Sequence, residues 1–273
     1  MTRAPELIAP PGACDTHIHF YDAAAAVAPG APMPGSRTVD EYRAIQRRLG
    51  LERVIVVQPN AYADDNSLTL ASMAALGPGA RGVAVVRPGV ADAELERLTK
   101  AGIRGLRIMT LNGGTLGFDV MDGLMARVHE FGWHANIQLD GRELPRHAAQ
   151  IQRLPGWFVI DHTGKFLEPV SVGHPAFAAL LRLLDTGRCW VKVSGPYETS
   201  RTGPPAYEDV SRLARALIAH APERVIWASN WPHPSARALP DDADLLDLLL
   251  DWAPGADTQR RILRDNPAEL YGF

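Results

Sequence analysis

The sequence contains only two cysteines, Cys14 and Cys189, among its 273 residues. Both lie inside apolar segments and neither belongs to a C-x-x-C pair. This pattern excludes a disulfide-rich scaffold, and we expect reduced core residues in a cytoplasmic protein. The chain also lacks a large excess of either charge, since the net charge is −3 and the pI is about 6.3. That balance gives no electrostatic basis for binding nucleic acid or an anionic membrane surface.

Long apolar runs are missing as well. No segment approaches the ~18 consecutive apolar residues that a membrane span requires, and the Pro-rich stretch Met1–Pro11 has no signal-peptide core. The chain also lacks low-complexity sequence, an interdomain linker and a G-x-G-x-x-G turn after its first predicted strand. We therefore expect a soluble protein with a single domain, residues 1–273, that is not a dinucleotide-binding fold.

The sequence does contain a regular alternation of two patterns. Short apolar, often β-branched runs predict buried strands at Ala13–Phe20, Arg53–Gln58, Gly82–Arg87, Gly105–Met109, His134–Leu139, Trp157–Asp161, Trp190–Ser194 and Val225–Ser229. Between them, apolar residues at three- and four-residue spacing predict helices at Val39–Leu49, Ser67–Leu76, Ala91–Ala101, Val120–Phe131, Glu143–Arg153, Pro175–Thr186, Tyr207–His220 and Ala243–Trp252. Eight such units predict an α/β fold, a closed (β/α)8 barrel of the TIM type. We also expect a long loop at Ala23–Arg37 and a last helix at Asp257–Leu263.

Polar side chains occur at the carboxyl ends of these otherwise apolar strands. That end of a (β/α)8 barrel carries the active site, so polar residues gathered there are candidates for catalysis or binding. His17 and His19 are two residues apart on strand one, which places both side chains on one face. The residues that we expect to meet at this end are His17, His19, Asn60, Arg104, Arg107, Gln138, His162, Lys165, Lys192, Tyr197, Asn230 and His233.

Structural roles compete with functional ones at several of these positions. A single histidine on a strand is more often a hydrogen-bonded core residue, but the His17–His19 pair together with His162 favours a shared site. Asp15 and Asp161 could orient these histidines and fix their tautomers.

Basic residues in the strands have two interpretations. Arg104 and Arg107 could each pair with a helix acid or bind a substrate carboxylate. Lys192 lies inside an apolar strand, which is costly unless the ammonium is paired or faces a polar pocket. A role for Lys192 in the site is therefore favoured.

A metal site is the first alternative to consider. Three imidazoles, from His17, His19 and His162, could hold Zn²⁺ with a fourth position left for water. The usual companions are missing, because strand four supplies arginines, strand five supplies Gln138 and strand eight supplies Asn230. Basic side chains around a cation would add positive charge to positive charge, whereas they suit a substrate carboxylate. We expect a site without a metal or other cofactor, with zinc as the alternative.

The motifs resemble the amidohydrolase superfamily, whose barrel carries a His-x-His motif on strand one. Here that motif is Asp15-Thr16-His17-Ile18-His19, and the closing Asp265-Asn266-Pro267-Ala268 is similar to the superfamily's C-terminal signature. The resemblance spans nearly the whole chain. It is strongest to the metal-independent lactone branch, which holds D-galactarolactone isomerase and 2-pyrone-4,6-dicarboxylate lactonase. The motifs that carry it are Val57-Gln58-Pro59-Asn60, Gly105-Leu106-Arg107, Ile160-Asp161-His162-Thr163-Gly164-Lys165, Trp190-Val191-Lys192-Val193-Ser194-Gly195 and Asn230-Trp231-Pro232-His233-Pro234.

One position departs from the lactonase pattern. Lactonases of this branch place an aspartate on strand eight that handles the proton of the attacking water, and this chain has Asn230 there. An amide cannot serve as a general base. The resemblance therefore implies an isomerase that converts a 1,5-lactone of a sugar diacid, such as galactarolactone, into the 1,4-lactone. A hydroxyl of the substrate takes the place of water in this reaction.

The isomerase hypothesis assigns a role to each group. Arg107, with Lys165 or Arg104, would bind the free carboxylate, and His162 is the candidate proton shuttle, although spacing alone leaves the identity of the base open. The groups expected to polarise the ring carbonyl are His17, His19 and Lys192.

Three alternatives remain open, and the expected partner in each is a small carboxylated molecule. The first is a lactonase that hydrolyses 2-pyrone-4,6-dicarboxylate or a related lactone, with His162 or His233 activating water. The second is a Zn²⁺-dependent amidohydrolase or decarboxylase. The third is an inactive protein that binds sugar acids. The sequence predicts no oligomeric state.

Overall fold

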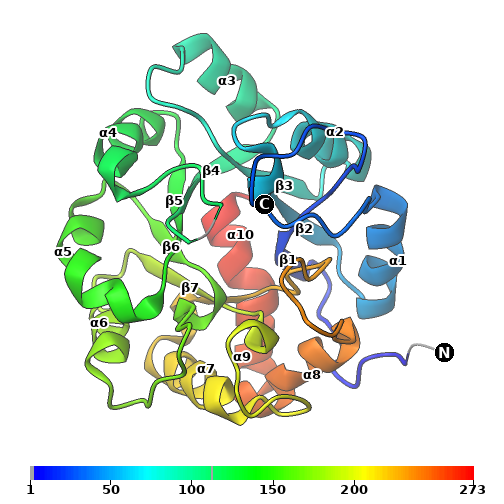
Figure 1. Cartoon of the computed structure of the whole chain (residues 1–273). Coiled ribbons are helices and arrows are strands. Elements are labelled where there is room, and N and C mark those ends of the chain that lie inside the picture. The colour runs from blue at the N-terminus through cyan, green and yellow to red at the C-terminus, as the bar shows by residue number, and fades with distance from the viewer. Residues whose placement is uncertain (1–2, 112) are drawn as a thin grey trace.

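Eight parallel strands form the centre of the molecule. The computed structural model describes residues 3–111 and 113–273, and its sheet runs in the order β1-β2-β3-β4-β5-β6-β7-β8. Backbone hydrogen bonds bring β8 back to β1, since the amide of Asn230 donates to the carbonyl of His17 (3.0 Å) and that of His19 to Trp231 (2.9 Å). The predicted (β/α)8 barrel is thus confirmed (Figure 1). The strands are β1 (Cys14–Ile18), β2 (Arg53–Val57), β3 (Ala80–Ala84), β4 (Ile103–Met109), β5 (His134–Gln138), β6 (Phe158–Ile160), β7 (Cys189–Val193) and β8 (Val225–Trp227).

A helix follows each strand and covers the outside of the barrel (Figure 1). The first illustrates how the sequence sets the ends: Thr38 and Glu41 form a reciprocal capping box at its start, and Gly50 ends it with a φ of 70°. All eight predicted helices are present, with ends shifted by at most two residues. They are α1 (Val39–Leu49), α2 (Ser67–Leu76), α3 (Asp92–Lys100), α4 (Phe118–His129), α5 (Leu144–Arg153), α6 (Pro175–Leu184), α7 (Glu208–His220) and α8 (Asp242–Trp252).

Short 3₁₀ turns follow four strands at the end where polar side chains were expected. They shorten the strands relative to the sequence prediction, because the chain bends as soon as the polar residues begin. The turns are Asn60–Tyr62 after β2, Gly141–Glu143 after β5, His162–Gly164 after β6 and Pro196–Glu198 after β7, and a further turn, Pro222–Arg224, precedes β8.

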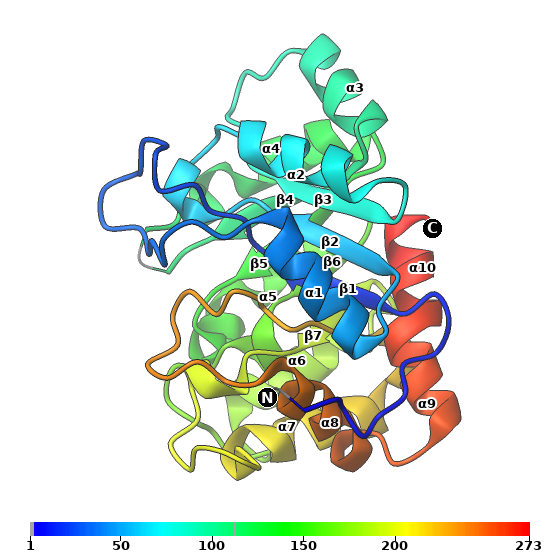
Figure 2. The same ribbon diagram turned by 90° about the vertical axis from the view of Figure 1, so that its right-hand side faces the viewer.

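The C-terminal segment is more helical than the sequence predicts. In place of one short helix, α9 (Ala256–Arg260) continues through a π-helical turn, Arg261–Asp265, into α10 (Asn266–Tyr271). Pro267 lies in the first turn of α10, where its missing N–H needs no intrahelical partner. The Asn266 side chain donates to the carbonyls of Pro222 (2.8 Å) and Val225 (2.6 Å). These bonds hold α10 against the amino end of β8, so the helix lies across one end of the barrel (Figures 1 and 2).

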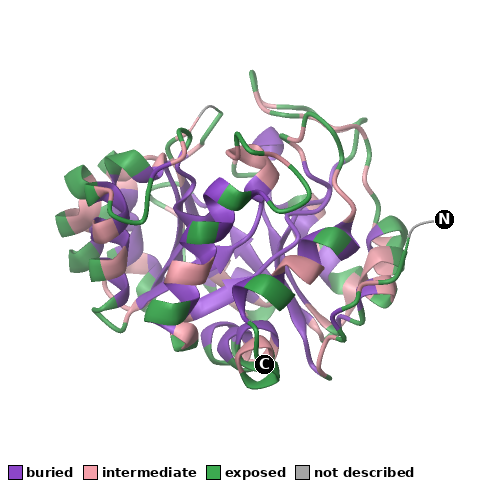
Figure 3. Ribbon diagram, turned by 90° about the horizontal axis from the view of Figure 1, so that it is seen from below, coloured by how far each residue is buried: buried purple, intermediate pink, exposed green. Residues whose placement is uncertain are grey.

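The apolar core surrounds a polar centre. The strands are buried except at Arg53, Arg81, Arg104 and Met109, which are half-buried (Figure 3). Their outward apolar side chains, together with the inner faces of the helices, form the largest buried cluster. A second cluster includes Trp190, Leu270 and Tyr271 and fills the end covered by α10. Buried polar side chains that include His19, Arg107 and His162 lie toward the opposite, carboxyl end of the strands.

The predicted loop at Ala23–Arg37 contributes to that opposite end. Tyr21 and Arg37 pair through an isolated antiparallel bridge at its base, and Met33 packs near the buried Tyr62. Pro32 at its centre lines the catalytic cavity described below. Among the described residues, no helix has the length and apolar character that crossing a bilayer requires.

Candidate active site

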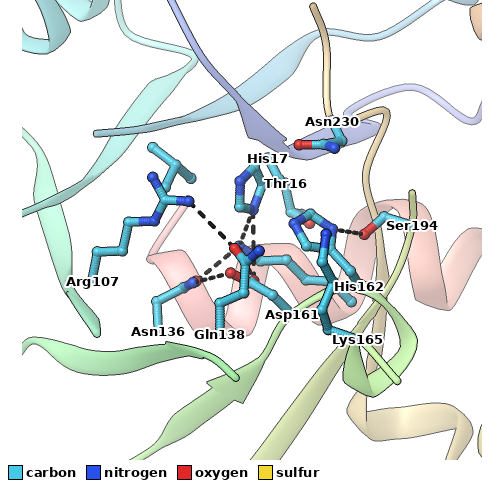
Figure 4. Close-up of polar contacts among 12 residues, drawn as sticks. Thr16, His17, Arg107, Asn136, Gln138, Asp161, His162, Lys165, Ser194 and Asn230 are labelled. Carbon is cyan, nitrogen blue, oxygen red and sulfur yellow. Dashed lines mark hydrogen bonds and ion pairs between the residues drawn. The ribbon is translucent and has the colours of Figure 1, made fainter. Parts of the chain in front are cut away.

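A cavity lies at the carboxyl ends of the strands, with about 350 Å³ of space that is partly open to solvent. Six of the side chains singled out in the sequence line it directly. Residues that the sequence analysis did not select also contribute, among them Tyr21 and Glu198. Because the lining comes from seven different strand ends, barrel closure is needed to build it. Figure 4 shows Arg107, Gln138, His162 and Asn230 around the same centre. The predicted residues that line the cavity are His19, Asn60, Arg107, Gln138, His162 and Asn230.

The two histidines of β1 form one hydrogen-bonded chain. His19 Nδ1 lies 2.7 Å from the carbonyl of Val57, which can only accept, so this nitrogen carries the proton. Burial lowers the pKa of His19 to about 3, so the ring is neutral and its Nε2 is a bare acceptor. The Nε2 of His17 lies 3.0 Å away and must donate to it. The Nδ1 of His17 is consequently bare and faces the opposite direction.

Lys192 supplies the donor that this bare nitrogen needs. Its ammonium lies 3.2 Å from His17 Nδ1, 2.8 Å from Asn136 Oδ1 and 3.2 Å from Asp161 Oδ1. The ammonium therefore has hydrogen-bond partners in His17 and Asn136 and forms an ion pair with Asp161, while the amide of Asn136 also donates to Asp161 Oδ2 (2.7 Å). Lys192 lowers the pKa of the Asp161 carboxyl against the opposing effect of burial. The network keeps a full positive charge and its counter-charge in the barrel centre.

The burial of His17 and Lys192 differs from the prediction that they polarise the substrate carbonyl directly. His17 and Lys192 have no exposed surface, whereas His19 retains 3%. Lys192 and His17 therefore lie beneath the cavity floor and are not placed to contact a substrate. Asp15 also differs from expectation: it accepts the backbone amides of His17 and Ser229 and the Tyr42 hydroxyl, so it joins β1 to β8 and orients no imidazole.

His162 projects into the cavity from a strained turn. Its φ is +52°, in the left-handed region that non-glycine residues rarely adopt, and the next residue, Thr163, has a φ of +56°. His162 Nδ1 lies 2.9 Å from the Ser194 hydroxyl, which fixes the ring plane. Burial lowers the pKa of His162 well below its ordinary value. The ring is therefore a neutral imidazole that can take up a proton only transiently.

Asn230 is held in one orientation by residues behind it. Its Nδ2 donates to the Tyr197 hydroxyl (2.9 Å), which in turn lies 2.9 Å from His233 Nδ1, while His233 Nε2 lies 3.1 Å from Asp242. Burial raises the pKa of Tyr197 well above its ordinary value, so the phenol keeps its proton and donates it to His233. Asn230 Oδ1 thus remains available to the cavity. Tyr197 and His233, predicted to bind substrate, instead position Asn230.

Arg107 is the guanidinium of the cavity. One Nη donates to the carbonyl of Gln58 and the other lies 3.3 Å from Gln138 Oε1, so the planar group is held by the ends of two strands. It is 5% exposed and lines the cavity beside Asn60. A fixed guanidinium at the edge of the cavity is the geometry expected for a carboxylate-binding group.

Two other predicted carboxylate ligands are not available. The prediction that Arg104 binds the carboxylate is wrong. Arg104 is three residues from Arg107 on β4, so its side chain points to the opposite face. Its guanidinium donates to the carbonyls of Thr99 (2.9 Å) and Ile103 (2.8 Å) on the outside of the barrel. Lys165 does reach the site, but its ammonium is paired with Glu198, with side chains 7% and 5% exposed.

Sequence reasoning missed Asn136 and Glu198. Asn136 could have been found, because it is two residues before Gln138 on β5 and must share its inward face. Glu198 follows β7 in a short 3₁₀ turn, and no strand periodicity extends to it.

Comparisons with known proteins identify the family of this chain. A family model described as amidohydrolase matches residues 14–273. The chain belongs to the amidohydrolase family. This amidohydrolase is 39% identical to a D-galactarolactone isomerase of Agrobacterium fabrum, over 98% of this chain and 94% of the relative. It is 34% identical to a 2-pyrone-4,6-dicarboxylate hydrolase of Comamonas testosteroni, over 98% of this chain and 92% of that relative. An apo crystal structure from Agrobacterium tumefaciens superposes with a TM-score of 0.92 at 39% identity, covering 99% and 97% of the two chains.

The donor atoms of this amidohydrolase do not fit a zinc ion bound by three histidines. Within the described residues, the group of three potential ligands whose donor atoms all lie within 4.8 Å of one another consists of His17, Asp161 and His162, and it does not include His19. The Lys192 ammonium is already 3.2 Å from both His17 Nδ1 and Asp161 Oδ1. A metal ion there would have to displace an ammonium held by two hydrogen bonds and an ion pair.

The buried histidines predict a stability that falls steeply in acid. Burial lowers the pKa of His19 and His134 to about 3 and depresses the pKa of His17 and His162 as well. The unfolded chain therefore takes up protons first, so this stability is complete above about pH 6.5. Below it, each histidine removes about 1.4 kcal/mol per pH unit. Burial raises the pKa of Asp15 to about 6, so protonation of this carboxyl stabilises the folded state as the pH falls. This one group offsets only part of the effect of the four histidines.

Urea unfolding at pH 7, 6 and 5 measures this slope. The variant His134→Gln is a matched control, because His134 packs against Tyr271 at the far end of the barrel and does not line the cavity. In this variant, the loss of unfolding free energy on acidification should be smaller than in the wild type by about 1.4 kcal/mol per pH unit. Equal unfolding free energies at pH 7 and pH 5 in the wild type would contradict the neutral state assigned to these rings.

Proposed function

We propose that this amidohydrolase is a lactone isomerase that converts the 1,5-lactone of a sugar diacid, such as galactarolactone, into the 1,4-lactone. The observation that carries the proposal is the fixed amide of Asn230 at the position where β8 would need a carboxylate to activate water. Tyr197 holds that amide in place from behind, so its free oxygen can orient a substrate hydroxyl. The 39% identity to an isomerase of that name supports the same substrate class.

The cavity supplies the parts that this reaction needs. Arg107 binds the free carboxylate, and Asn230 holds the attacking hydroxyl against the ring carbonyl. The O–H bond of that hydroxyl breaks as its oxygen bonds to the carbonyl carbon, and the negative charge that develops on the carbonyl oxygen lies above the Lys192 network. When the old ring C–O bond breaks, the leaving oxygen takes the proton. His162 carries that proton from one oxygen to the other, so neither water nor net acid appears.

Hydrolysis is the second candidate, and one observation favours it. Glu198 places a carboxylate at the cavity wall, and relatives at 34% and 32% identity are named as lactone hydrolases. Incubation of the protein with each galactarolactone isomer, followed by NMR, separates the two reactions. Ring exchange without net acid supports the isomerase, whereas open-chain acid as the sole product establishes the lactonase.

We also infer that turnover needs no metal ion and takes place in the cytoplasm. The inference about the metal is supported by the position of the Lys192 ammonium between the candidate ligands, and that about location by the two buried free cysteines. Activity that survives chelation in protein shown to be free of zinc by elemental analysis is the expected result. Loss of activity with removal of stoichiometric zinc would overturn the first part.

The variant Asn230→Asp tests the role of the amide. A carboxylate at this position can take a proton from water, so the ratio of hydrolysis to isomerisation should rise by about 10-fold or more. Quantitative NMR of both products from one reaction measures the ratio directly. Asn230→Ser removes the amide without adding a base and serves as the control. A ratio that is unchanged in Asn230→Asp would show that the amide does not suppress water attack.

A further inference from the structure

A buried ion pair lies in the wall of the catalytic cavity. Lys165 follows the turn after β6 and Glu198 ends the turn after β7, and their charged groups are in contact with side chains 7% and 5% exposed. Glu198 lines the cavity and also a wider neighbouring groove of about 1220 Å³, which includes Tyr197, Arg201 and Arg237. The ion pair therefore lies between the catalytic cavity and the neighbouring groove.

The charged groups around the cavity can neutralise a single substrate carboxylate. Arg107 faces the cavity with neutral partners only, an amide oxygen and a backbone carbonyl. Lys165 is neutralised by Glu198, and Lys192 is below the floor with no exposed surface. Arg201 in the outer groove is paired with Glu168. Among the described residues that line the cavity itself, Arg107 is thus the cation without an acidic partner, and Glu198 supplies a carboxylate.

Glu198 is also close to the groups assigned to the reaction. A point above the Cα of Gly195, where a side chain would begin, is 3.3 Å from Glu198 Oε2, 3.4 Å from His162 Nδ1 and 3.6 Å from Asn230 Nδ2. The backbone of Gly195 has a φ of +57°, which disfavours any larger residue. The Glu198 carboxylate, the His162 ring and the Asn230 amide therefore lie around one glycine, so Glu198 places an anionic acceptor beside the groups assigned to the reaction.

We propose that Glu198 determines specificity: it accepts hydrogen bonds from the hydroxyl groups of the substrate and repels a second carboxylate. This inference rests on the proposed function and narrows its substrate class to lactones with one free carboxylate and free hydroxyls. A ring that carries two carboxylates would place one anion on Arg107 and the other against Glu198, and like charges in one cavity are strongly unfavourable. Lys165 holds the Glu198 carboxylate in position and balances its charge.

The substitution Glu198→Gln, made in the full-length protein, tests the proposal with two ligands. For galactaro-1,5-lactone, kcat/KM should fall about 10- to 100-fold, because a hydrogen bond to a charged acceptor becomes one to a neutral amide. For 2-pyrone-4,6-dicarboxylate, used as a binding probe in calorimetry, the Kd should fall about 10-fold or more as the repulsion is replaced by attraction to Lys165. Glu168→Gln makes the same change at the exposed partner of Arg201 and should alter neither value.

The test distinguishes this inference from the proposed function. If the wild type isomerises the lactone but binds the dicarboxylate as tightly as Glu198→Gln does, specificity does not reside in Glu198. If the wild type binds the hydroxylated lactone and discriminates against the dicarboxylate without turnover, the proposed function fails and the specificity assignment stands. Should the lone ammonium of Lys165 prevent folding, the double variant Lys165→Gln/Glu198→Gln replaces the ion pair by two amides. It should lose the discrimination between the ligands, and discrimination retained there would overturn the proposal.

Discussion

Replacing Lys192 by methionine should lower the free energy of unfolding by about 3–5 kcal/mol and reduce kcat by about 1000-fold or more. Methionine fills the volume but removes the ammonium, so the buried Asp161 carboxylate loses its counter-charge and Asn136 Oδ1 and His17 Nδ1 lose their donor. The positive charge beneath the carbonyl oxygen disappears in the same step. Urea unfolding and the NMR rate of lactone exchange measure the two effects.

A double variant separates stability from catalysis. Lys192→Met with Asp161→Asn removes both charges of the pair, so no uncompensated carboxylate remains in the core. Most of the lost stability should return, while kcat stays low because the cation is still absent. Recovery of kcat along with stability would mean that Lys192 supports the fold alone and contributes nothing to the electrostatics of the reaction.

Replacing His162 by glutamine should reduce kcat by about 100- to 10,000-fold with little change in KM. Glutamine keeps a polar group near the Ser194 hydroxyl but cannot carry a proton between two oxygens. Arg107 and Asn230, which bind the carboxylate and the hydroxyl, are left in place. The measurement is the initial rate of lactone exchange over a range of substrate concentrations.

Two controls accompany this variant. His129→Gln makes the same change on an exposed position of α4 and should leave kcat unaltered. Ser194→Ala removes one hydrogen bond to the His162 ring and should cost about 10-fold, less than loss of the ring itself. A kcat for His162→Gln within a factor of two of the wild type would transfer the proton shuttle to another group, for which Glu198 is the nearest candidate in the cavity wall.

Several features of the fold could be predicted from the sequence because they depend on residues close together in the chain. Alternating apolar strand and helix patterns identify eight βα units, and each predicted helix is present. The spacing of His17 and His19 places both on one face of β1, and a polar residue at the end of each strand marks the active end of the barrel. The same local rule, applied to β4 and β5, separates Arg104 from Arg107 and adds Asn136.

The partners of these residues were decided by the tertiary structure alone. Lys192 meets His17 across 175 positions of sequence, and Glu198 meets Lys165 across 33. Which cation is free and which is neutralised follows from that pairing: Arg107 remains available to a ligand, whereas Lys165 does not.

The sequence by itself determined the fold, the active end of the barrel and the residue types that gather there, since hydrophobic periodicity and strand alternation are local properties. Only the closed barrel decided the protonation states, the free charges and the orientation of Asn230. These properties depend on burial and on contacts between strands, and both form only when β8 closes the barrel against β1.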